Sequence, residues 1–108
     1  MEHKDLQSLV QFPDGIVGRS TVFETERLWS QVLCFARNQT LGPIADEQAD
    51  AMWTVLAGEA AFTVGSKRKR AKQWGSVLAP AGHKVFVANA STEPLVLLVV
   101  AAPPPAAG

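Results

Sequence analysis

Glu47 and His83 have the chemistry expected of a reactive site. A histidine titrates near neutral pH and can act as a general base or as a metal ligand. A carboxylate inside an apolar pocket has a raised pKa, which would suit Glu47 to acid–base work. Each residue also has a simpler interpretation. For His83 the sequence favours the simpler interpretation, in which the residue ends a turn with its ring in water. For Glu47 the sequence favours neither interpretation: the residue could be a buried catalytic carboxylate or part of a solvated acidic loop with Asp46 and Asp50.

A strand–turn–strand unit over residues 75–89 positions His83. Residues 76–79 and 84–88 have β-type composition and flank Pro80-Ala81-Gly82. Proline fixes φ for the first central position of a turn, and glycine accepts a positive φ without a Cβ clash. The unit therefore predicts two paired strands, with His83 directly before the start of the second.

The remaining segments favour an all-β domain. Short β-rich runs at regular spacing are typical of a sandwich or barrel. Residues 45–62 are ambiguous, because 45–53 have helical propensity while 53–56 and 60–64 are strand-like, and the neighbouring strands favour strand. The final run is apolar on both faces, so it should be central or covered by a partner. The expected strands lie at 16–17, 21–23, 28–36, 60–64 and 95–100, with an arm or short helix at 1–15, a loop at 38–43 and a flexible tail at 103–108.

Composition limits the classes of function. The chain has 108 residues, 47% of them apolar, and a formal net charge of zero, which indicates one domain and no nucleic-acid or membrane partner. The single cysteine, Cys34, and the lack of an apolar leader at residues 1–5 predict a cytoplasmic protein. The basic run at 67–72 could bind phosphate, but a solvated hairpin whose charges protect a sheet edge is the favoured interpretation.

The order of residues around the turn resembles the second signature of the cupin superfamily. Gly75, Pro80, Gly82 and Asn89 match it, whereas Val85 stands where the family has a histidine. The family's first signature ends in a glycine that resembles Gly58. Its glutamate then falls on Ala51, and its two histidines fall on Ala45 and Glu47, or on Ile44 and Asp46 with a longer spacer. The resemblance implies a small single-domain cupin: a jelly-roll β-barrel over residues 16–102 that usually forms a homodimer.

Strand alternation predicts which residues face the interior of such a barrel. A first-row metal needs at least three converging N, O or S ligands, and only Glu47 and His83 could supply them. We therefore expect no metal and no cofactor. Trp53 is more simply core packing than a stacking platform for a ring. The predicted pocket residues are Ala45, Glu47, Ala49, Ala51, Trp53, Val55, His83, Val85, Val87 and Asn89.

Three classes of function remain open. The first, which the sequence favours, is a metal-free barrel that binds a small, mostly apolar organic ligand in its pocket. The second is an enzyme of isomerase or oxygenase type that uses Glu47 and His83. The metal-free epimerases of this fold pair a histidine with a tyrosine, and this chain has no tyrosine. The third is a protein-interaction module. No residue identifies the ligand.

Overall fold

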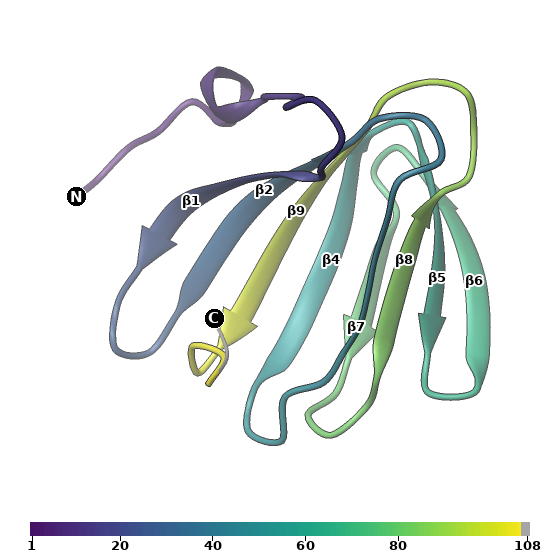
Figure 1. Ribbon diagram of the computed structural model, residues 1–108. Coiled ribbons are helices and arrows are strands. Elements are labelled where there is room, and N and C mark those ends of the chain that lie inside the picture. Colours follow the sequence, from purple (N-terminus) through teal and green to yellow (C-terminus); the bar gives the residue numbers. More distant parts are fainter. Residues whose placement is uncertain (107–108) are drawn as a thin grey trace.

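The computed structural model describes residues 1–106, which fold into two antiparallel sheets that face each other (Figure 1). This confirms the predicted all-β fold of jelly-roll type. No helix within these residues is long and apolar enough to cross a membrane. One sheet has the order β1 (Gly18–Glu24), β2 (Trp29–Phe35), β9 (Leu95–Ala102), β4 (Asp50–Ala57) and β7 (Ser76–Ala79). The other has the order β3 (Thr40–Ile44), β8 (Val85–Asn89), β5 (Glu59–Val64) and β6 (Lys67–Lys72).

The ambiguous segment 45–62 contains two strands and a loop. Residues 50–57 and 59–64 form β4 and β5, as their context predicts, but residues 45–49 form no strand. Gly58 joins the two strands with φ at 85°, and a Cβ there would lie 2.4 Å from the carbonyl oxygen of Pro94. Only glycine accepts both the positive φ and the close approach of the Pro94 carbonyl oxygen, so Gly58 has a structural role.

Two predicted boundaries differ from the structure. The loop expected at 38–43 is strand from Thr40, because Thr40 and Leu41 pair with Ala88 and Val87 of β8. The Gly-Pro pair that suggested a loop lies inside β3, where Gly42 has φ at 107° and the register shifts. Residues 16 and 17 precede the first strand, which begins at Gly18.

The central position predicted for 95–100 is confirmed, because β9 lies between β2 and β4. Its outer face contacts a small cluster around Val32, Cys34 and Val96. The amino-terminal segment covers this cluster with Leu6, Leu9 and Val10, and it contains a short 3-10 helix, η1 (Leu6–Leu9). Burial raises the pKa of the Cys34 thiol above its ordinary value of 9.0.

The basic run forms β6, the edge strand of its sheet. Pairing of Lys69 with Phe62 and of Lys67 with Val64 puts both lysines on the inner face of the sheet, where Phe62 is buried. Charges that point inward from an edge strand discourage pairing with another chain. Arg70 alternates to the outer face and its Nε lies 3.0 Å from Glu59 Oε2. The arrangement fits the edge-protecting interpretation of the hairpin.

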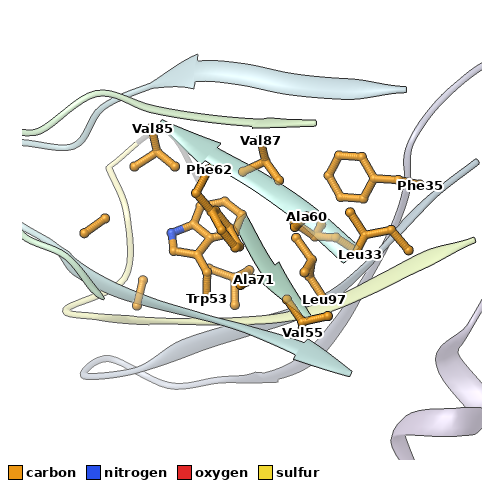
Figure 2. Close-up of a cluster of buried hydrophobic side chains, with 14 of the residues drawn as sticks. Leu33, Phe35, Trp53, Val55, Ala60, Phe62, Ala71, Val85, Val87 and Leu97 are labelled. Carbon is orange, nitrogen blue, oxygen red and sulfur yellow. The ribbon is translucent and has the colours of Figure 1, made fainter. Parts of the chain in front are cut away.

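The main core lies between the sheets, and its side chains change size along the barrel. At one end Val55, Leu97 and Leu33 form a row across neighbouring strands, beside Phe35 (Figure 2). The middle row holds Trp53 between Val77 and Val99. The far row holds Ala79, Ala51 and Ala101, and then Trp29. Large side chains therefore close one end, and small ones leave space at the other.

Candidate functional site

A cavity of about 140 Å³ occupies the end of the barrel that carries the alanine row. Alanine removes side-chain volume at three adjacent positions of one sheet, and Val85 of the other sheet faces the same space. The cavity is mostly apolar. It is lined by Arg19, Trp29, Leu33, Leu41, Ile44, Ala45, Asp46, Ala49, Ala51, Trp53, Ala79, Pro80, His83, Val85, Val99, Ala101 and Pro105.

Asp46 organises the mouth of this cavity. Its Oδ1 accepts the backbone N–H groups of Gln48 and Ala49, both at 2.8 Å, and its Oδ2 accepts the N–H of Ala106 at 2.6 Å. The hydrogen bonds from Gln48, Ala106 and Ala49 lower the pKa of this carboxyl. The same side chain thus shapes the β3–β4 loop and holds the segment after β9 beside it.

The segment predicted as a flexible tail begins beside the cavity. Pro105 lines the mouth, and Ala106 is hydrogen-bonded to Asp46. Residues 107 and 108, which belong to the same prediction, lie outside the described residues.

Most of the predicted pocket residues line the cavity: Ala45, Ala49, Ala51, Trp53, His83 and Val85. His83 is exposed at the mouth. Val55 and Val87 also face the interior, but they are fully buried and do not line the cavity. Val87 pairs with Phe62 of the neighbouring strand β5 in the same sheet, so it contributes to the core beneath the cavity.

Glu47 lies outside the cavity, which differs from its predicted inward position. Alternation of side chains holds only within a strand, and β4 begins at Asp50. Asp46 bends the preceding loop, and Glu47 is exposed with its Oε2 beside Gly82. Glu47 and His83 therefore do not meet inside the barrel as an acid–base pair.

Asn89 also has a different position from the predicted one. Its Nδ2 donates to the carbonyl oxygen of Glu93 at 2.8 Å and lies 3.3 Å from the carbonyl oxygens of Phe35 and Ala36. Its Oδ1 accepts the N–H of Ser91 at 3.0 Å. The side chain therefore joins the end of β2 to the turn before β9, and it is a structural residue.

Several cavity residues were not predicted from the sequence. Alternation along β7 and β9 is the signal that identifies Ala79 and Ala101, because Val77 is half-buried and Val99 is buried two positions before them. No local pattern identifies Arg19, which donates from Nε to Gln31 Oε1 at 3.1 Å, or Pro105. Their place in the lining depends on tertiary packing.

The cavity lacks the residues that would hold a metal. Ala45, Ala51 and Val85, the positions to which the resemblance assigns ligands, all line it. Across residues 1–106, no group of three His, Cys, Asp or Glu side chains could bind a metal ion. Asp46 and His83 are the two side chains of these types in the lining, and two ligands are too few for a first-row metal. The residues present do not fit a metal site.

The fold has counterparts among solved structures. TT1209 from Thermus thermophilus is 31% identical over 95% of this chain and 98% of its own, with a TM-score of 0.91. A Klebsiella pneumoniae protein with a double-stranded beta-helix domain is 25% identical over 100% of this chain and 94% of its own, with a TM-score of 0.89. A cupin 2 conserved barrel domain protein from Leptotrichia buccalis is 25% identical over 89% of this chain and 45% of its own, with a TM-score of 0.78. No family model and no curated protein matches the chain.

Proposed function

The chain belongs to the cupin superfamily, and from this premise we propose that its barrel binds one small, mostly apolar organic molecule. The observation that carries the proposal is the alanine-lined cavity of about 140 Å³ between the sheets. A buried apolar space of about 150 Å³ is known to hold benzene. The cavity therefore suits a molecule about as large as a single six-membered ring.

The residues around the cavity support a ligand-binding site rather than a packing defect. Trp53 forms its floor, and the alanine row leaves space above the ring. Asp46 and His83 lie at the mouth, where a ligand would enter, and Arg19 reaches the lining from the edge strand β1. Apolar surfaces with a few polar groups are typical of small-molecule sites. Because Glu47 lies outside this space, the enzyme alternative based on Glu47 and His83 has no support from the geometry.

Titration with toluene, followed by two-dimensional NMR, tests the proposal. We expect saturable shifts for residues around the cavity, above all for Ala51, Trp53 and Val85. The variant Ala51→Leu places a larger side chain in the cavity and should abolish these shifts. Met52→Leu is the matched control, because Met52 is the next residue of β4 and is exposed on the opposite face of the sheet. It should bind as the wild type does.

Two results would count against the proposal. One is an absence of saturable shifts in the wild type. The other is equal binding by the wild type and Ala51→Leu, which would place the ligand elsewhere. Native mass spectrometry of the protein as purified would then identify any molecule that is carried through purification.

We also propose that the protein is a homodimer that pairs through the outer face of its larger sheet. Met52 and Leu78 are cross-strand neighbours on this face and are 45% and 65% exposed. Val100 of β9 pairs with Met52 in the same row. A second copy would cover this apolar row about a two-fold axis. Light scattering should give a dimer mass at tens of micromolar, and Met52→Lys with Leu78→Lys should give a monomer.

The control for the dimer is Ile16→Lys, which adds a charge at an exposed apolar residue away from this row. It should remain a dimer. A monomer mass for the wild type, or a dimer mass for the double variant, would contradict the proposed interface.

A further inference from the structure

The indole N–H of Trp53 is a buried donor with no acceptor among residues 1–106. The residue is only 4% exposed, and its Nε1 has no hydrogen-bond partner among the described residues. Buried polar groups are usually paired, and a buried tryptophan usually finds an acceptor. An acceptor from outside residues 1–106, either water or a ligand, would satisfy this donor.

Packing fixes where this donor points. Trp53 lies between Val77 and Val99 in the sheet and makes an edge contact with Phe62, with ring centroids 6.3 Å apart and planes at 64°. Figure 2 shows its nitrogen on the side of the ring away from Leu33 and Phe35, at the end of the barrel where Val85 lies. Trp53 and Val85 both line the cavity. The N–H thus points toward the cavity end of the barrel, but the nitrogen itself has less than 1 Å² of accessible surface, so a ligand would have to lie directly against it.

We infer that the ligand carries a neutral hydrogen-bond acceptor, such as a carbonyl oxygen, that accepts from Trp53 Nε1. This inference rests on the proposed function and narrows its ligand class to small carbonyl compounds, such as ketones, aldehydes or esters. The rest of the ligand would contact Ala51, Ala79 and Ala101, which offer only apolar surface.

The charges around the cavity favour a neutral acceptor over an anion. The Asp46 carboxylate lies at the mouth and would repel a carboxylate ligand. Arg19, the guanidinium in the lining, donates from its Nε to Gln31. An anion bound at Trp53 would be separated from this guanidinium, because Arg19 is on β1 and strands β2 and β9 lie between β1 and β4. Moving an ionised carboxylate into apolar surroundings without a paired cation is costly. A carbonyl oxygen needs only one donor, and Trp53 provides it.

Two ligands of nearly the same shape test the inference: cyclohexanone and methylenecyclohexane, which differ by an oxygen in place of a CH₂ group. Both are titrated into the wild type and into Trp53→Phe, which keeps an aromatic ring but removes the donor. The measured quantity is the ratio of the two dissociation constants in each protein. A net hydrogen bond contributes about 0.5–1.5 kcal/mol, so the preference for cyclohexanone should fall about 2- to 12-fold in the variant.

A second measurement on the wild type does not depend on the variant. The Trp53 indole N–H resonance should move downfield with cyclohexanone and not with methylenecyclohexane. An unchanged ratio together with the same resonance shift for both ligands would overturn the inference while leaving the proposed function intact. If neither ligand binds the wild type, the inference fails, and the proposed function fails with it if toluene does not bind either. If Trp53→Phe does not fold, the wild-type resonance decides.

Discussion

Replacing Ala51 with leucine should stabilise the protein, whereas the same change at Ala60 should destabilise it. Both alanines lie on strands and face the interior, but Ala51 lines the cavity and Ala60 is fully buried in the closed core. Ala51 stands between Ala79 and Ala101, so its added carbons would extend over other small side chains. Ala60 pairs with Asn89 and Ala71 and does not line this cavity.

The magnitude follows from the atoms added. Leucine has three more carbons than alanine, and each buried CH₂ group contributes about 0.8 kcal/mol, for a sum of about 2.4 kcal/mol. Fixing the leucine rotamer costs about 0.5–1 kcal/mol. The expected gain for Ala51→Leu is therefore about 1–2 kcal/mol. Overpacking at a filled site costs about 1–3 kcal/mol, which is the expectation for Ala60→Leu.

Denaturant unfolding of both variants and the wild type measures these differences. Thermal unfolding provides a check, since 1 kcal/mol shifts Tm by about 4–8 °C for a domain of about this size. Opposite signs for the two variants are the predicted result. If Ala51→Leu loses as much stability as Ala60→Leu, the alanine row is close-packed, and the reasoning from side-chain size along the barrel is wrong.

Three further outcomes are expected. Asn89→Ala should lower the free energy of unfolding by about 2–4 kcal/mol, because it removes several hydrogen bonds worth about 0.5–1.5 kcal/mol each. The lowered pKa of Asp46 stabilises the native state above the carboxyl's ordinary pKa of 3.8, so the Ala106 N–H should lose protection from hydrogen exchange as the pH falls below this value, and Asp46→Asn should reduce protection at all pH values. Replacing Lys67 and Lys69 with valine should cause self-association, measured by light scattering, because the edge strand loses its inward charges.

Each of these outcomes has a control. Ser91→Ala keeps the Asn89 side chain and should lower the free energy of unfolding less than Asn89→Ala does. Equal losses would show that the Asn89 side chain does not hold β2 to the turn before β9. If protection of the Ala106 N–H from hydrogen exchange does not depend on pH, the Asp46 carboxylate does not provide that protection. Removing two outward charges, with Arg68→Val and Lys72→Val, should promote self-association less than replacing Lys67 and Lys69 does. Stronger self-association of the outward double variant would contradict edge protection by the inward lysines.

The turn at 80–82 and the strands around it could be predicted because their determinants are local. Pro80 and Gly82 specify the backbone, and the apolar run at 95–100 requires a central strand. Strand β3 could not be predicted, because its formation depends on pairing with β8 and Gly42-Pro43 favours a loop locally.

The site was predictable only where alternation within a strand applies. Ala51 and Trp53 follow it in β4, and Val85 follows it in β8. Glu47 does not, because the Asp46 hydrogen bonds replace strand geometry with a loop. The cavity has no local signature, because it arises when alanines from three strands come together. The lack of an acceptor for Trp53 Nε1 among residues 1–106 also depends on tertiary packing.

Diffraction from crystals pressurised with xenon tests the central claim most directly, because xenon binds in apolar cavities of this size. The account predicts a xenon atom between the sheets, in contact with Trp53, Ala51 and Val85, and no xenon there in Ala51→Leu crystals. Wild-type crystals in which that space is filled by protein side chains, with no xenon between the sheets, would contradict it.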